Sequence, residues 1–203
     1  MAAVAGAALA IAGNALVLAA TPHAPKDTVS YPLSPSSFRA GQLFFALTQL
    51  LMAWGIVGVS RLRIGGGGRA ARTGSWLAVA GFVLTVPGEL ALIFVADAGI
   101  DSAGANAASS IYGMAVLMAD VGLIMLGAAA LRADVWPHSG GFLVLGLGLF
   151  QLLVVTPVVL GAGFASVPAF IVIAVQDVMV AQLGRRLIGR RTREGNHGEA
   201  PLD

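Results

Sequence analysis

Six long apolar stretches divide the chain and constrain its fold more than any other feature. A helix needs about 20 mostly apolar residues to cross the hydrocarbon core of a bilayer, and each stretch meets that length. The protein is 57% hydrophobic and 11% charged, against about 25% charged residues in a soluble domain. The sequence therefore predicts an all-α fold, a polytopic membrane helix bundle with six transmembrane helices. The expected spans cover about residues 3–20, 40–60, 75–96, 108–131, 140–160 and 165–184.

Basic residues concentrate on one side of this predicted topology. Cytoplasmic loops carry an excess of Lys and Arg, and only Lys26 and Arg39 fall on the opposite side. Both termini are therefore expected in the cytoplasm (N-in, C-in), in a multi-pass protein of the cell (plasma) membrane. The basic residues on the cytoplasmic side are Arg61, Arg63, Arg69, Arg72, Arg132, Arg185, Arg186, Arg190, Arg191 and Arg193.

Two domains are expected: a six-helix transmembrane domain over residues 1–189 and a disordered cytoplasmic tail over 190–203. The Arg-rich tail is predicted to bind anionic lipids. With a net charge of +2, the basic residues indicate topology and predict no nucleic-acid partner. A small-residue sequence ending at Ala20 resembles a signal-peptide cleavage site, but no Lys or Arg precedes it, which favours a retained first helix.

The longest connection, residues 21–38, contains four prolines. Proline fixes one backbone angle and limits the freedom of the chain. The loop is expected outside the membrane. Two interpretations remain open: an ordered cap over the bundle with Tyr31 and Leu33 facing inward, or a stiff linker with no further role.

Three carboxylic acids, Glu89, Asp120 and Asp177, fall inside the predicted spans. A carboxylate at bilayer depth is disfavoured by roughly 2.5–3.5 kcal/mol on insertion scales, so it is expected to face a protein interior or a wet cavity. No span contains Lys or Arg to neutralise these acids. Because a low dielectric disfavours the charged form, at least one acid is expected to be protonated. The alternative is a structural role, with the acids hydrogen-bonding between helices.

Counting residues along the helices gives each acid an expected depth. Glu89 lies about 20 Å above Trp76 and Asp120 about 18 Å above Arg132, at 1.5 Å per residue. These two acids are therefore expected to share one pocket. Asp177, about 12 Å above Arg185, is expected to form a second layer or a structural contact.

Proline marks two expected irregularities. In Pro87-Gly88-Glu89, the missing backbone donor and the flexible glycine predict a kink that places Glu89 beside unpaired carbonyls. Thr156-Pro157 predicts a similar break in the fifth span. An ordinary packing kink is the alternative at both positions.

Polar and aromatic residues on the inward helix faces are the candidates for substrate binding, since aromatic faces stabilise cations. There is no Cys, and the three His lie in predicted loops or the tail, so no metal and no cofactor is expected. The candidates are Asn14, Gln42, Phe45, Gln49, Phe82, Tyr112, Gln151 and Phe170.

The intramembrane acids Glu89, Asp120 and Asp177 in a small multi-helical chain resemble those of the integral-membrane terpene cyclases of bacterial and fungal natural-product pathways. The resemblance covers the layout of the whole chain, although seven spans are often drawn for the fungal members. It implies an enzyme that cyclises a prenyl or terpenoid chain by protonation, with these three acids as catalytic residues. Glu89 or Asp120 would donate the proton, and a hydrophobic prenylated molecule in the bilayer would be the partner.

Two other functions fit the same pattern. Buried acids and kinked helices also suit a small proton-coupled transporter or channel, and six helices are few for alternating access, so this interpretation predicts an oligomer. A non-catalytic membrane subunit, with the acids as interhelical contacts, is the third interpretation.

Overall fold

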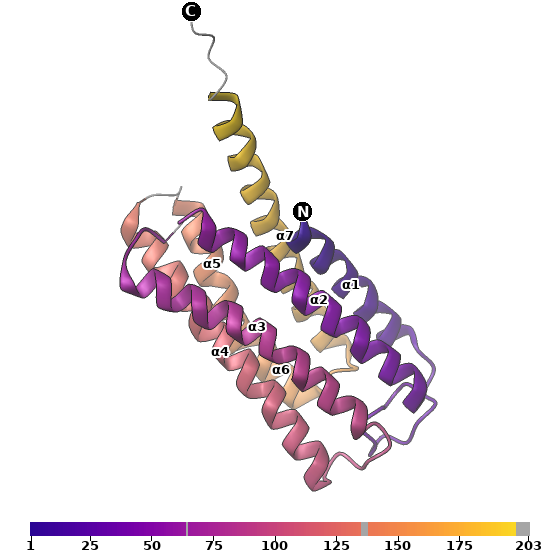
Figure 1. Cartoon of the computed structure of the whole chain (residues 1–203). Helices are drawn as coiled ribbons and strands as arrows, with labels where there is room; N and C mark the ends of the chain where they lie inside the picture. The colour runs from indigo at the N-terminus through magenta and orange to yellow at the C-terminus, as the bar shows by residue number, and fades with distance from the viewer. Residues whose placement is uncertain (64, 135–137, 198–203) are drawn as a thin grey trace, which may run out of the picture.

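The computed structural model describes residues 1–63, 65–134 and 138–197, with the backbone alone for His138 and residues 190–197. Over these residues the protein is all-α, with six helical segments long and apolar enough to cross a membrane, which confirms the predicted fold class (Figure 1). The helices are α1 (Ala2–Ala19), α2 (Pro35–Arg61), α3 (Arg69–Phe94), α4 (Ala103–Ala133), α5 (His138–Phe150), α6 (Thr156–Ala162) and α7 (Val167–His197). A π-helical turn, η1 (Gln151–Val155), joins α5 to α6 within the fifth span.

Local capping fixes where several helices begin and end. The Ser34 side chain accepts a hydrogen bond from the Ser37 amide at the start of α2, where Pro35 occupies the first helical position. Ser102 caps α4 by accepting from the Ala105 amide. Such caps satisfy donors that the first helical turn leaves unpaired. At the other end of α4, Asp134 takes the left-handed conformation that commonly stops a helix.

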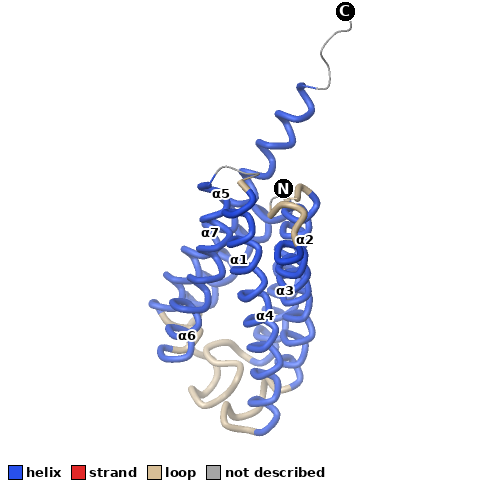
Figure 2. The backbone as a smooth tube through the Cα atoms, turned by 90° about the vertical axis from the view of Figure 1, so that its left-hand side faces the viewer, coloured by secondary structure: helices blue, strands red, loops and turns tan. Residues whose placement is uncertain are grey.

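The helices form a closed ring. Each span packs against its neighbour in sequence, and α7 returns to pack against both α5 and α1. The N-terminus and the far end of α7 lie at the same end of the bundle (Figures 1 and 2). We call this the basic end, because the described arginines 61, 63, 69, 72, 132, 185 and 186 lie there. The opposite, loop end carries residues 20–34, 95–102 and 163–166.

Helices α3 and α4 pack in backbone contact along a seam of small residues. A Cβ atom added to Gly81 would lie 2.3 Å from the Ala119 amide nitrogen, and one added to Gly122 would lie 2.2 Å from that of Ala78. Residue n of α3 therefore faces residue 200 − n of α4 along the whole seam. The facing pairs are Gly74 with Leu126, Ala78 with Gly122, Gly81 with Ala119 and Gly88 with Tyr112.

Helix α5 packs against α4 in an equally regular register, but α6 does not continue it. Three facing pairs, Gly141 with Leu131, Leu145 with Gly127 and Gly148 with Ile124, all place residue n opposite 272 − n. Extended further, this register would bring residue 160 beside Tyr112. Instead, over the described residues no Cα atom of α6 comes within 8 Å of one in α4. Helix α6 therefore diverges from α4 towards the loop end (Figure 2).

The two prolines behave differently from each other. Pro157 immediately follows the start of α6, so the expected break in the fifth span is confirmed as the π-helical turn before it. Helix α3, by contrast, continues from Arg69 to Phe94 with Pro87 inside it, so the kink predicted at Pro87 does not interrupt the helix.

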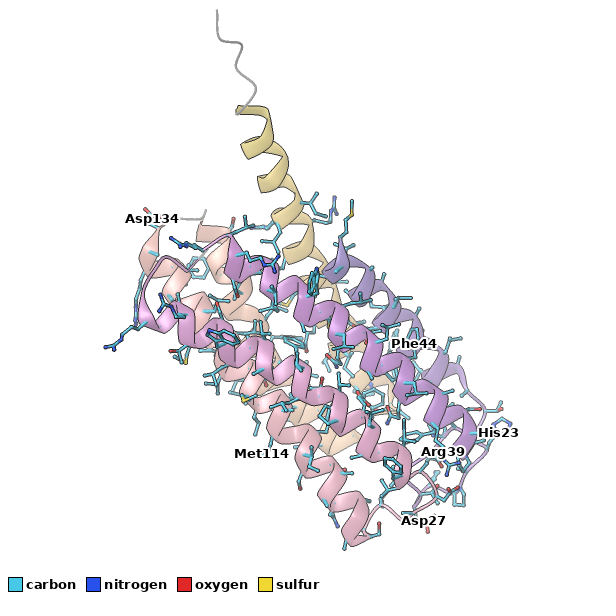
Figure 3. The ribbon with its side chains drawn as sticks, viewed as in Figure 1. His23, Asp27, Arg39, Phe44, Met114 and Asp134 are labelled. Carbon is cyan, nitrogen blue, oxygen red and sulfur yellow. The ribbon has the colours of Figure 1, made fainter. Side chains whose placement is uncertain are left out.

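The loop at residues 21–34 is ordered and pairs with the connection between α3 and α4. The Val29 and Ser30 amides donate to the Ala98 and Ala96 carbonyls at 3.0 and 3.2 Å, and Asp27 accepts from the Ile100 amide at 2.8 Å. Ser30 is fully buried beneath this contact. Arg39 of α2 forms an ion pair with Asp97, and His23 and Asp27 lie at the same end (Figure 3). Of the two expected arrangements, the structure supports the ordered cap.

The predicted domain boundary falls inside α7. The helix continues past residue 189 to His197 and projects beyond the bundle (Figure 1). The described part of the expected tail, residues 190–197, is thus helical. Residues 198–203 of that tail lie outside the described residues.

Candidate functional site

Glu89, Tyr112 and Gln49 meet in the bundle interior from three different helices. The Tyr112 side chain lies close enough to interact with both the Glu89 carboxyl and the Gln49 side chain. The Gln49 carbonyl oxygen Oε1 is buried and has no hydrogen-bond partner among the described residues. Glu89 is buried, with 4% of its surface exposed.

Glycine sets the spacing of this cluster. Gly88, beside Glu89, faces Tyr112 so closely that an added Cβ would lie 2.9 Å from the tyrosine Cα. Only a residue without a side chain permits this approach. The close approach of α3 and α4 is what brings the carboxyl of one helix to the hydroxyl of the other.

Asp177 of α7 lies on the far side of the same cluster. Its carboxylate acts electrostatically on Tyr112, and it is buried with 5% of its surface exposed. Over the described residues, no Cα of α7 lies within 8 Å of one in α3 or α4, so Asp177 acts on Tyr112 across a gap between helix backbones. The predicted second layer or structural contact for Asp177 stays a prediction. We call Gln49, Glu89, Tyr112 and Asp177 the central cluster.

Asp120 does not share the level of Glu89. By the α3–α4 register, Asp120 lies opposite residue 80, nine residues along α3 from Glu89, or about 13 Å along the helix axis. The expected common depth is therefore wrong. The predicted depths count from Trp76 in α3 and from Arg132 in α4. In the observed register Trp76 faces residue 124 of α4, which lies eight residues nearer the loop end than Arg132. The two starting points therefore lie at different levels.

The remaining predicted residues lie on either side of the central cluster. Asn14 and Gln42 are buried, and the α1–α2 contacts at Gly6 and Gly13 place both nearer the loop end than Gln49. Phe45 packs edge-on against Phe164 at that end, and Phe170 lies half-buried one turn into α7. On the basic side, Phe82 packs against the hydrophobic core and Gln151 lies in the π-helical turn, where its amide approaches the Thr156 hydroxyl at 3.5 Å.

Several buried oxygen atoms in the interior have no partner among the described residues. They are Asp177 Oδ2, Asp120 Oδ2, Gln49 Oε1 and Gln176 Oε1. The amide oxygens can only accept hydrogen bonds, whereas a carboxyl oxygen can also donate when it is protonated. The nearby hydroxyls do not satisfy them, because Thr48 and Thr85 donate to carbonyls of their own helices. A buried polar atom without a hydrogen bond is costly, so these oxygens favour a proton or a donor at the site.

Sequence reasoning missed Gln176. It precedes Asp177, and its oxygen is buried and unpartnered. The sequence signal that could have identified Gln176 is its position as a polar residue directly beside an intramembrane acid. Among the described residues, no three His, Cys, Asp or Glu side chains come together as metal ligands would.

Fold and site together define a polytopic membrane protein with buried acids and amides between its helices. Compared with protein-family models, curated proteins and solved structures, the chain matches none.

Proposed function

We propose that the protein is an integral-membrane enzyme that cyclises a prenyl or terpenoid chain, and that Glu89 is the acid that starts the reaction. The observation that supports this most is the position of the central cluster. Buried Glu89, which interacts with Tyr112, lies at the level where no Cα atom of α6 comes within 8 Å of one in α4. A lipid-soluble chain that entered between these two helices would meet this acid.

The proposed chemistry uses two acids and returns both to their starting state. Glu89 donates its proton to an alkene carbon, which leaves a carboxylate and a tertiary carbocation. A second alkene attacks the cation and closes the ring. Asp177 then removes a proton from the neighbouring carbon as the final double bond forms. Tyr112, in contact with Glu89 and under the field of Asp177, relays that proton back.

The surroundings suit a carbocation. The neighbouring Phe45 and Phe82 would supply π-faces that stabilise positive charge. No Lys or Arg falls within the spans to repel it. Buried unpartnered oxygens of Asp177 and Gln49 add negative potential on the same side. The product is an isomer of the substrate, because every proton added is removed.

The proposed sidedness follows the arginines. The basic end would face the cytoplasm of the cell that holds the protein in its plasma membrane, with the helix end beyond Gly189 against anionic lipids. The loop end, covered by residues 21–34, would face outward. Substrate would then reach the central cluster through the membrane and not through the cap.

The test compares lipid-soluble metabolites from cells that express the wild type, Glu89→Gln or the control Asp101→Asn, an exposed acid of the loop end. The cells are fed farnesylated and geranylgeranylated precursors, and products are separated by liquid chromatography–mass spectrometry. We expect a wild-type product of unchanged mass and altered retention, kept in Asp101→Asn and lost in Glu89→Gln. If the wild type forms no isomer from any substrate, the proposed function fails.

Proton-coupled transport is the second candidate, and one observation favours it. The Asp120 carboxyl is buried, and its Oδ2 atom has no partner among the described residues. It lies about 13 Å from the level of Glu89, towards the basic end. Two acids at different depths suit stepwise proton passage. In proteoliposomes with a trapped pH dye, wild-type proton flux that Asp120→Asn abolishes would support transport, and flux equal to that of empty liposomes would exclude it.

A further inference from the structure

A cavity of about 490 Å³ lies at the basic end, between the end of α2 and the start of α3. It is far from the central cluster: Arg72 at its edge is 17 residues along α3 from Glu89, about 25 Å. None of the functions considered above uses it. The lining residues are Val57, Val59, Ser60, Arg61, Arg63, Gly65, Gly66, Gly67, Gly68, Ala71, Arg72, Ser75, Trp76, Val79 and Leu126.

Three arginines give this cavity a strong positive charge. Arg61, Arg63 and Arg72 all line it, and no Asp or Glu is among the described lining residues. Asp134 follows Ala133, the residue that meets Gly66, but Asp134 does not line the cavity. Arg61 lies 5.8 Å from the Trp54 ring, a contact that leaves its charge intact. Guanidinium groups match the geometry of phosphate oxygens and bind them in pairs.

The cavity is amphipathic. Its inner wall is apolar, formed by valine, alanine and leucine side chains that include Val79 and buried Leu126. The rim carries the arginines, the glycine loop and the Ser75 hydroxyl. Trp76, also on the rim, has 70% of its surface exposed. Exposed tryptophan is typical of the boundary between lipid and water.

From this arrangement we infer that the cavity binds the phosphate of an anionic phospholipid. Arg63 and Arg72 hold the phosphate from the two sides of the glycine loop, and Arg61 adds charge at the edge. The apolar wall receives the upper part of an acyl chain. A free phosphate would use only the rim, whereas a phospholipid also uses Val79 and Leu126. This site is distinct from the arginines of the chain end after Gly189.

The experiment uses the full chain, purified in detergent and titrated with phosphatidylglycerol while native mass spectrometry counts bound lipid. We compare the wild type with the double variant Arg63→Gln/Arg72→Gln. The control is Arg69→Gln, which removes one positive charge at the start of α3 from a residue that does not line the cavity. We expect affinity to fall about tenfold or more in the double variant, since charge-assisted hydrogen bonds are lost, and to stay within about twofold in the control. Equal affinity in all three proteins would overturn the inference.

Two further measurements show whether the phosphate belongs to a lipid or to a soluble anion, and whether the variants still fold. Inorganic phosphate and glycerol phosphate are added as competitors. If millimolar phosphate displaces the lipid through the same arginines, the ligand is a soluble anion and the lipid assignment is overturned. If only phospholipid binds, the inference stands. Should the double variant lose its helical circular dichroism, Arg63→Gln and Arg72→Lys are each measured alone, with the same expected order.

Discussion

Gly88 of α3 lies against the backbone of Tyr112 in α4, so that a single methyl group added to the glycine would come within 2.9 Å of the tyrosine Cα. This contact joins the packing of the bundle to its candidate chemistry. The same helix pair holds the Glu89 carboxyl against the Tyr112 hydroxyl. Anything that moves the two helices apart therefore disturbs the central cluster.

Gly88→Ala is expected to destabilise the protein. The obstructing atom belongs to the backbone of a neighbouring helix, so the helices must shift, and overpacking of this kind costs about 1–3 kcal/mol. The matched control is Gly113→Ala, because a Cβ there meets no atom within 4 Å. The control should gain a little stability, since alanine favours helix more than glycine. Thermal unfolding in detergent, followed by circular dichroism, measures both. Equal midpoints would show that the contact is unimportant.

Tyr112→Phe removes the hydroxyl that interacts with both Glu89 and Gln49. Both residues then lose a polar neighbour inside the membrane, and stability should fall by about 1–3 kcal/mol. A double-mutant cycle with Gln49→Leu measures whether the residues act together, and we expect a coupling of about 0.5–3 kcal/mol. Strictly additive effects would argue against the Gln49–Tyr112 contact. Tyr31→Phe in the loop serves as the control tyrosine.

Ser30→Ala is expected to leave stability unchanged or raise it. The Ser30 hydroxyl is fully buried and has no partner among the described residues, although its backbone amide is bonded to Ala96. Alanine keeps the backbone contact and removes an unsatisfied polar atom. By comparison, Arg39→Gln breaks an exposed ion pair with Asp97, for which about 0–1 kcal/mol is expected. A clear loss of stability in Ser30→Ala would indicate that the hydroxyl has a partner.

Membrane sidedness is testable because the chain contains no Cys. Single cysteines are introduced at Lys26 in the cap and at Arg69, the first residue of α3, both exposed. A membrane-impermeant maleimide applied to intact cells should label Lys26→Cys, and should label Arg69→Cys only after the cells are opened. The reverse pattern would place the basic end outside.

The fold was accessible from the sequence because each span is defined by its own composition. Hydropathy and length located all six helices, and Pro157 located the irregularity in the fifth. The site was only partly accessible. Glu89, Tyr112, Gln49 and Asp177 were each recognised, but their meeting depends on which helices are neighbours and at what register. Periodicity within one helix carries no information on either.

The wrong depth predicted for Asp120 shows why the sequence could not bring the site residues together. Counting residues from the end of each helix assumes that the ends lie in one plane. Helix α4 has 31 residues and α3 has 26, and the seam offsets their ends. The seam is visible in the sequence as small residues at alternating spacings of four and three: Gly74, Ala78, Gly81, Thr85 and Gly88. That pattern indicates a close helix contact without naming the partner.

The π-helical turn at Gln151–Val155 has a consequence for the phase of the fifth span. A π-helical hydrogen bond closes over one more residue than an α-helical one. Since each residue of an α-helix advances about 100° around the axis, the additional residue turns every later side chain to a different face. The side chains of α6 are thus presented in an orientation that α5 alone would not give. The number of residues in the span, as much as their identity, determines which side chains of α6 face the other helices.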